Sequence, residues 1–272
     1  MPKQVQLRRD TAALWTSIDP TLAQGELAME TDTGKLKIGN GTNTWKQLTY
    51  LASTGSLSAD WSSVSQEAKI QSSDIEASDK FGVSVGISTN GDTVVSGAHG
   101  EDTGGSGAGA TYVFTRSGTT WSQQDKLQPS DVGAGDTSGF QVSISGDGNT
   151  IITSSYGDDT GATGAGAAYI FTRSGTTWSQ QAKLVASNPG EYDSFGKGVG
   201  ISTDGNTVLV GAPGEDTGVD DAGAVYAFTR SGTTWSQQAF IQCSDRAQYD
   251  GFGEQIAVSS DGNDAIIGVK EK

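Results

Sequence analysis

The chain has 272 residues, among them 39 glycines and six tryptophans, and its formal net charge is −15 at pH 7. So acidic a chain lacks the Lys and Arg that replace phosphate counterions, which argues against nucleic-acid binding. There is no apolar run of about 18 residues, so we expect no membrane insertion, and no signal-peptide pattern opens the sequence. The single cysteine, Cys243, and the single histidine, His99, exclude an internal disulfide, Cys-rich metal sites and most His-based triads and zinc sites.

The charge is distributed unevenly, which indicates a domain boundary. Residues 1–50 carry six basic and five acidic side chains, so the other 222 residues carry a net charge of −16. A Ser/Gly-rich stretch follows at residues 51–60, as in linkers. We therefore predict a first domain over 1–50, a linker or ring-closing strand over 51–63, and a second domain over 64–272. The alternative is one domain with a less acidic edge.

The first domain is expected to be a small β module. The sequence from Leu22 to Trp45 predicts a hairpin with Asp32, Thr33 and Gly34 at its turn, and Trp45 packing behind it.

A 57-residue repeat dominates the second domain. The decapeptide TRSGTTWSQQ occurs three times without change, starting at Thr115, Thr172 and Thr229. A fixed period of this length without insertions is typical of propellers and solenoids. The predicted repeat units are 64–120, 121–177, 178–234 and 235–272.

Each repeat predicts four strands, represented in the first copy by residues 83–88, 93–97, 111–116 and 121–128. Asn90-Gly91 favours a two-residue hairpin turn, and no convincing amphipathic helix follows residue 60. The predicted fold class is all-β, with a β-propeller of about four blades, each of four antiparallel strands. A large apolar residue that recurs in each blade belongs in the core, so three phenylalanines are expected to be largely buried: Phe81, Phe195 and Phe252.

The fourth repeat lacks the third expected strand. We expect a closed four-bladed ring in which residues 51–61 supply the closing strand, since a free edge invites aggregation. The alternative is an open array completed by a neighbouring subunit.

Acidic pairs recur in the Gly-rich loops between the second and third strands. Such carboxylates could bind Ca²⁺, which takes about six to eight oxygen ligands, but no DxDxDG loop is present. The alternative is that they are solvated turn residues. No other cofactor is expected. The candidate metal ligands are Glu101, Asp102, Asp158, Asp159, Glu215 and Asp216.

The 57-residue unit resembles the FG-GAP repeat of integrin-α-like propellers. The naming residues are Phe81-Gly82, Phe195-Gly196 and Phe252-Gly253, together with Gly211-Ala212-Pro213, whereas Ser138-Gly139 departs from the pattern. The resemblance implies a β-propeller used for adhesion or ligand recognition.

The first 50 residues resemble the N-terminal attachment domain of phage tail fibres and major tropism determinants. The matching stretches run from Val5 to Trp15 and from Leu22 to Trp45. The resemblance implies a module, commonly trimeric, that attaches a fibre to the virion. The residues it marks for attachment are Arg8, Arg9, Trp15 and Trp45. The alternative is a generic β-hairpin cap on the propeller.

Together these features predict a bacteriophage virion structural protein, a tail or head fibre that forms a homotrimer and contacts other tail or fibre proteins. The propeller would face the host surface and bind a glycan or protein receptor. No catalytic residues are predicted, because no unrepeated carboxylate pair lies among apolar residues that would raise one pKa. The alternatives are a cell-surface or secreted integrin-like adhesin and a fibre-borne polysaccharide depolymerase.

Overall fold

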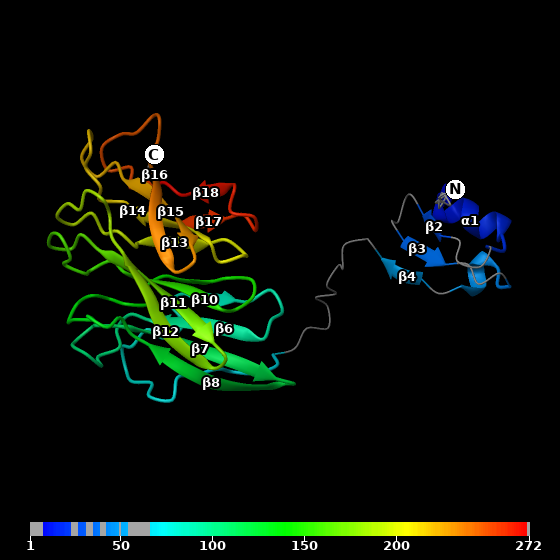
Figure 1. The fold of residues 1–272 in the computed structure, drawn as a ribbon, viewed down its shortest axis with the longest axis horizontal. Coiled ribbons are helices and arrows are strands. Elements are labelled where there is room, and N and C mark those ends of the chain that lie inside the picture. The colour runs from blue at the N-terminus through cyan, green and yellow to red at the C-terminus, as the bar shows by residue number, and fades with distance from the viewer. Residues whose placement is uncertain are drawn as a thin grey trace. The chain divides into compact units, whose positions relative to one another are not determined.

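The computed structural model describes residues 8–22, 27–30, 35–38, 42–48, 50–53 and 66–270. The chain divides into two compact units, residues 1–66 and 67–272 (Figure 1). Strands make up almost all of the regular structure, which confirms the all-β prediction. In the described part of the chain, no helix is long and apolar enough to cross a membrane.

The first unit contains a mixed four-stranded sheet in the order β1-β2-β3-β4. Strands β1 and β2 are parallel, and the other neighbours are antiparallel. The β2–β3 pair is the predicted hairpin, whose turn lies outside the described residues. The elements are β1 (Arg8–Asp10), α1 (Ala12–Ile18), β2 (Leu27–Glu30), β3 (Lys35–Ile38), η1 (Trp45–Gln47) and β4 (Tyr50–Ser53).

Trp45 forms the core of this small module. Its side chain is buried and packs against Leu22 and Leu48. The Lys37 ammonium donates to the Trp45 carbonyl oxygen at 2.7 Å and lies 4.6 Å from the centroid of the indole ring. This buried cation therefore has both a hydrogen-bond acceptor and an aromatic face as partners.

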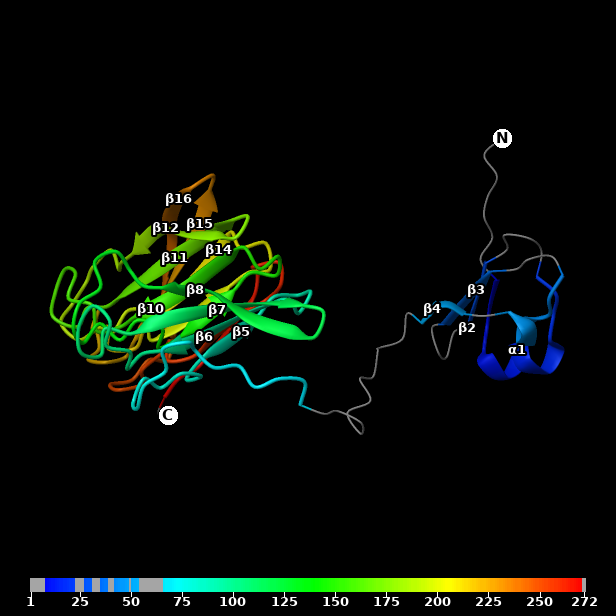
Figure 2. The same cartoon turned by 90° about the horizontal axis from the view of Figure 1, so that it is seen from below.

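The second unit is a stack of β-sheets in chain order (Figures 1 and 2). Three sheets are complete four-stranded antiparallel blades, and two further strands form a half blade. Blade 1 is β5 (Val85–Ile87), β6 (Thr93–Ala98), β7 (Ala110–Ser117) and β8 (Thr120–Leu127). Blade 2 is β9 (Val142–Ile144), β10 (Thr150–Ser155), β11 (Ala167–Ser174) and β12 (Thr177–Leu184). Blade 3 is β13 (Gly198–Ile201), β14 (Thr207–Ala212), β15 (Ala224–Ser231) and β16 (Thr234–Ile241), and the half blade is β17 (Ile256–Val258) and β18 (Ala265–Ile267).

The four predicted strands are present in each of the three complete blades, but the first turn differs from the prediction. Gly91 has a positive φ of 74°, whereas Asn90 does not, so the turn is not the two-residue type expected. Ser88 and Thr93 close a longer turn, in which the Asn90 side chain accepts hydrogen bonds from the Ser88 hydroxyl and the Asp92 amide. A polar side chain that satisfies its own turn explains why Asn or Asp recurs here.

Adjacent blades are joined by a β-bulge in the outer strand pair. Between Val113 and Phe114 the register shifts, which leaves Gln124 as the extra residue on β8. Its side-chain oxygen accepts a hydrogen bond of 2.9 Å from the Trp178 indole N–H of blade 2. Gln181 and Trp235 repeat this contact between blades 2 and 3, at the same distance. The invariant Trp and Gln of the repeated decapeptide are therefore inter-blade residues.

The recurring phenylalanines lie in or near the core. Phe195 and Phe252 are buried as expected, whereas Phe81 is only partly buried. The ring of Phe195 packs edge-on against Tyr226 and Phe228, with centroids 5.3 and 6.1 Å apart. The glycine that follows has a positive φ in every copy, between 82° and 104°, a conformation that disfavours any side chain.

The two ends of the stack are open in the described part of the second unit. No described strand pairs with β18 other than β17. Of the segment expected to close the ring, residues 51–53 belong to β4 of the first unit, and residues 54–61 lie outside the described residues. The expected closed ring is therefore not observed among these residues.

Candidate functional site

The acidic pairs lie in the loops between the second and third strands of each blade, as predicted. The first member of each pair is buried: Glu101, Asp158 and Glu215 are at most 6% exposed. The expectation of solvated turn residues therefore fails for these three, since a buried carboxylate needs partners.

In blade 2, Asp158 is held by a lysine and a tyrosine. Its carboxylate accepts hydrogen bonds from Lys183 Nζ at 2.9 Å and from the Tyr169 hydroxyl at 2.7 Å. Lys183 also donates to Asp131 at 2.8 Å, and the Tyr169 oxygen lies 2.9 Å from Asp131, so the two carboxylates share its single proton. Burial alone would raise the pKa of Asp158, but the bonds from Lys183, Thr160 and Tyr169 outweigh it and hold that pKa below its ordinary value. Blade 1 repeats the lysine contacts with Glu101, Lys126 and Asp74.

Blade 3 replaces this ionic contact with a neutral one. The position of Lys183 is taken by Phe240, and that of Asp131 by Asn188. The Asn188 amide donates to Glu215 at 3.0 Å, and its oxygen accepts from the Tyr226 hydroxyl at 2.8 Å. Phe240 packs on the ring of Tyr226, where Lys183 lies over Tyr169 in blade 2. The cation and one carboxylate are thus exchanged together, which preserves the charge balance.

The second member of each acidic pair organises its own loop. Asp102 accepts from the Gly107 amide, and Asp159 from the Gly164 amide, both at 2.7 Å. Asp216 accepts from the Asp221 amide at 2.6 Å. These three side chains are exposed, and each closes the same five-residue turn.

The carboxylates named as candidate calcium ligands already have partners within the protein. In blades 1 and 2 a lysine ammonium occupies the side of the carboxylate that a cation would take. Glu215 in blade 3 receives hydrogen bonds from three donors, the side chains of Asn188, Thr217 and Gln242. Among the described residues, no group of three or more His, Cys, Asp or Glu side chains is arranged to hold a metal ion.

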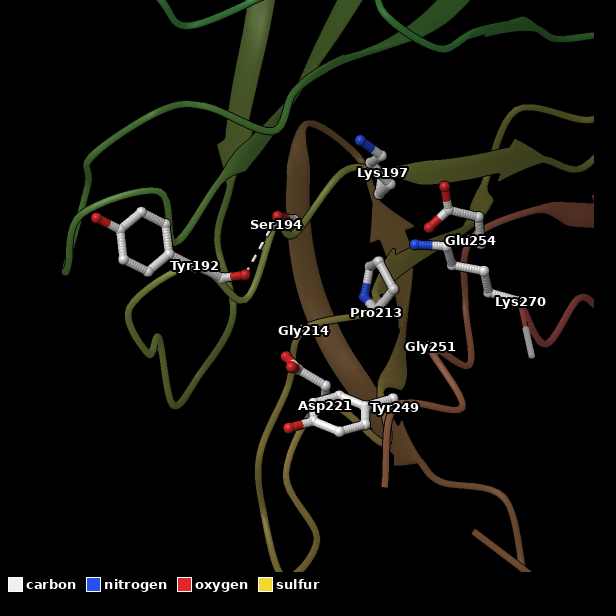
Figure 3. Close-up of a pocket in the computed structure, with 10 residues that line it drawn as sticks. All are labelled: Tyr192, Ser194, Lys197, Pro213, Gly214, Asp221, Tyr249, Gly251, Glu254 and Lys270. Carbon is white, nitrogen blue, oxygen red and sulfur yellow. Dashed lines mark hydrogen bonds between the residues drawn. The ribbon is translucent and has the colours of Figure 1, made fainter. Parts of the chain in front are cut away.

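A polar pocket of about 280 Å³ lies between blade 3 and the half blade (Figure 3). Its walls come from the loops before β13, after β14 and before β17, together with Lys270 near the end of the chain. Two lysines, two acidic residues and two tyrosines are among the residues that line the pocket, which suits a ligand rich in hydroxyl groups. The side chains in question are Lys197, Lys270, Asp221, Glu254, Tyr192 and Tyr249.

The two tyrosines of this pocket are unusually exposed and have strained backbones. Tyr192 and Tyr249 are 68% and 58% exposed, with φ values of 62° and 68°. A bulky residue in the left-handed region costs about 1–3 kcal/mol, and such strain gathers at functional sites. The equivalent residues in the first two repeats are Ser78 and Gly135. Our sequence reasoning missed both tyrosines, although aligning the repeats shows where the copies diverge.

A second unrepeated cluster adjoins the pocket through Lys197. The Lys197 ammonium lies 3.9 Å from the centroid of the Tyr156 ring and 4.6 Å from that of Phe140. Phe140 also packs edge-on against His99. Burial, reinforced by Lys270 and opposed by Glu254, lowers the pKa of Lys197. This cluster positions one wall of the pocket through aromatic contacts rather than an ion pair.

The raised pKa of Asp193, which lies beside Tyr192, leads us to expect that the stability of the protein depends on pH. Burial and the nearby charges of Glu215, Asp216 and Asp221 raise its pKa to about 6. Between pH 4 and 6 the folded state then holds a proton that the unfolded state has released, so stability falls as pH rises through this window. We expect Asp193→Asn to raise the melting temperature at pH 7.5 and to change it little at pH 4. Asn keeps an acceptor for the Gly190 amide.

Asp250→Asn is the matched control, because Asp250 makes the same hydrogen bond, of 2.7 Å, to the Ala247 amide. The described half blade lacks the acidic loop, so the gain at pH 7.5 should be smaller. Equal gains in the two variants would contradict the electrostatic explanation.

Of the four predicted attachment residues, the structure describes the side chain of Trp45 alone. Arg8 and Arg9 lie in β1, where their backbones pair with Ala28 and Met29, and Trp15 lies in α1. The side chains of these three lie outside the described residues. Trp45 is 2% exposed. Its part in attachment would thus be to hold the module together.

Comparisons with known proteins find matches to the N-terminal segment and to the repeats. Residues 5–43 match the model of the major tropism determinant N-terminal domain. A curated relative, "Hyaluronoglucosaminidase" of Streptococcus pyogenes phage H4489A, is 45% identical over 51 residues, which are 19% of this chain. The chain spans only 14% of that relative's length.

Two solved structures share 12% sequence identity with the chain. Saccharomyces cerevisiae Sqt1 has a TM-score of 0.41, with 62% of this chain and 38% of the other covered. A putative 6-phosphogluconolactonase from Bacteroides uniformis ATCC 8492 has a TM-score of 0.45, with 80% and 51% covered. Neither similarity supports an inference about function.

The FG-GAP repeat model matches three segments, residues 64–114, 121–171 and 178–228. Together they cover more than half of the sequence, and each contains a Phe-Gly or Ser-Gly pair at the same position. The chain therefore belongs to the FG-GAP repeat family, with a major tropism determinant N-terminal domain at its start.

Proposed function

We propose that this protein is a bacteriophage tail or fibre component that docks to the virion through its N-terminal module and binds the host surface through its propeller. The observation that carries the proposal is the order of domains, a tropism-determinant N-terminal domain followed by FG-GAP repeats. The similarity to a phage protein supports the same assignment. The proposed partners are other virion proteins and a glycan or protein receptor, and three copies of the chain are proposed to associate through their N-terminal modules.

The pocket between blade 3 and the half blade is the proposed host contact. The decapeptide that is identical in three repeats forms outer strands and inter-blade contacts, which are scaffold roles. The pocket instead gathers residues that differ between repeats, including Tyr192 and Tyr249. Exposed aromatic rings beside hydrogen-bonding groups can contact both the apolar and the polar parts of a surface receptor.

The adhesion prediction replaces two tyrosines by glycine, the residue that repeat 2 has at the equivalent position. Tyr192→Gly and Tyr249→Gly remove the rings and place glycine at left-handed backbone positions, as Gly135 does in repeat 2. We expect folding to be retained and binding to host cells to fall at least tenfold in the double variant. Ser78→Gly is the matched control and should bind as the wild type does. Unchanged binding of the double variant would exclude this pocket.

The attachment half of the proposal is tested separately in assembled particles. Deletion of residues 1–50 should abolish incorporation into virions, whereas the Tyr192→Gly, Tyr249→Gly variant should be incorporated normally but adhere poorly. Normal incorporation of the deletion variant would show that the N-terminal module does not dock to the particle.

A second candidate function is depolymerisation of host surface polysaccharide. The observation in its favour is the partial similarity to the phage hyaluronoglucosaminidase. Glycoside hydrolysis uses a general acid and a second carboxylate about 5–9.5 Å apart. Incubation with host envelope polysaccharide should release no oligosaccharide if the protein only binds. Release that disappears in an Asp158→Asn, Asp159→Asn variant would favour the enzyme.

A further inference from the structure

The two open ends of the blade stack expose apolar side chains that are buried at every internal blade boundary. At the first end, Val85 and Ile87 of β5 are 66% and 61% exposed. Their equivalents in blade 2, Val142 and Ile144, are 5% and 8% exposed, because they pack against blade 1. We call the surface of Val85 and Ile87 the leading face.

The other end shows the complementary pattern. Ile266 of β18 is 79% exposed, whereas its equivalents Val95, Ile152 and Leu209 are at most 6% exposed. Ile266 and Ala257 line a hollow of about 300 Å³ on the outer side of the half blade. We call this surface the trailing face.

Internal packing shows that these two faces fit each other. Val95 on the trailing side of blade 1 packs with Val142 and Ile144 on the leading side of blade 2. At the next boundaries the same positions meet, and Leu209 of blade 3 packs with Ile256 and Val258 of the half blade. The exposed leading and trailing faces are therefore two halves of a contact that the chain already makes three times.

A segment that corresponds to part of an outer strand lies at the first end of the stack. Residues 66–71 align with residues 123–128, the second half of the outer strand β8 and the residue after it. Glu67 forms an ion pair with Arg116 of blade 1 at 3.6 Å. The equivalent contact one blade later is the hydrogen bond that Arg173 donates to Gln124. Ile70 packs with the cluster around Phe114, Phe81 and Trp121. Blade 1 therefore carries, on its leading side, a segment that corresponds to part of an outer strand.

We propose that a second copy of this chain docks its leading face on the trailing face, so that residues 66–71 of that copy lie at the outer-strand position of the blade that β17 and β18 begin. This inference goes beyond the proposed function and does not depend on it. Among the described residues the two end faces stay exposed, so they do not pack on each other in this structure. Two copies joined at both ends would form a ring of eight blades, within the usual range of about four to eight, and three copies would exceed it. The contact is head-to-tail, so its two sides are different surfaces.

Disulfide trapping in the full-length chain tests this geometry. A Cβ built on Gly86 would lie 3.2 Å from Ile144 Cγ2 across the first blade boundary. The equivalent pair across the proposed contact is Ala257 of one copy and Ile87 of the next, which the proposal brings into direct contact, as a disulfide requires. Cys243→Ser provides the background, since Ser72 occupies the same position in the first repeat.

We expect a mixture of the Ile87→Cys and Ala257→Cys proteins to form a covalent dimer under mild oxidation, and neither protein alone to do so. Ile75→Cys mixed with Ala257→Cys is the control and should remain monomeric on a denaturing gel, because Ile75 is exposed on a different loop. Absence of the mixed dimer would overturn the proposal. A covalent dimer formed by either single variant alone would also overturn it, because that requires like faces to meet.

Glutamate substitutions provide a second measurement that needs no oxidation. Ile87→Glu and Ile266→Glu should each reduce the sedimentation mass of the wild-type assembly. An equimolar mixture should recover part of it, since one intact leading face and one intact trailing face remain. Circular dichroism verifies folding, and a mass unaffected by both substitutions would contradict the contact.

Discussion

Replacement of Lys183 by phenylalanine should destabilise the protein by about 2–3 kcal/mol, because it leaves the buried Asp158 carboxylate without its cation. The substitution introduces the side chain that blade 3 has at this position, Phe240, so the space around Tyr169 can accept an aromatic ring. Loss of charge compensation, rather than of volume, is the expected cause. Chemical denaturation at pH 7 measures the change in the free energy of unfolding.

The second half of this prediction is a rescue by Asp131→Asn. In blade 3, Asn188 donates to the buried Glu215 and accepts from Tyr226, which makes a lysine unnecessary. Asp131→Asn in the Lys183→Phe background should therefore recover about 1 kcal/mol. The single variant Asp131→Asn should cost less than about 1 kcal/mol, since Asp131 is half exposed. Additive losses in the double variant would show that the exchange in blade 3 is not a compensated pair.

The fold could be predicted from the sequence because the information is repeated. Four strands, their order and their spacing recur every 57 residues, so each weak local signal appears several times. The longer turn at Asn90 could not be predicted, because the same dipeptide suits both turn types and the Ser88 hydroxyl decides between them. Helix α1 was also not predicted, since seven residues carry too little periodicity.

The site was less predictable, because the partners of the acidic pairs are distant in the sequence. Nothing local in the sequence places Lys183 against Asp158, which lies 25 residues earlier. An alignment of the repeats would have shown Lys and Asp changing together to Phe240 and Asn188, the signal of a paired interaction. The pocket tyrosines required the structure, since their exposure and positive φ depend on the loops around them. Repetition thus made the scaffold predictable, and divergence between copies marked the candidate site.

Phe195→Ala should cause the largest loss of stability among core substitutions, about 3–5 kcal/mol, because the ring is fully buried between Tyr226 and Phe228. Removal of the ring leaves a cavity that the glycine-rich loops on either side cannot fill. Phe195 also lies between Ser194 and Lys197, which line the pocket. We therefore expect the variant to lose host binding at temperatures where it is still folded. Thermal and chemical denaturation measure the first effect, and cell binding the second.

Phe81→Ala is the matched control, because Phe81 makes the same edge-on contacts with Tyr112 and Phe114 but is only partly buried. Its loss should cost roughly half as much and leave host binding unchanged, since blade 1 does not line the pocket. Repeat 2, with Ser138 at this position, shows that a blade can form without the ring. If the two variants lost equal stability and equal binding, Phe195 would have no role specific to the pocket, and the link between core packing and recognition in blade 3 would be wrong.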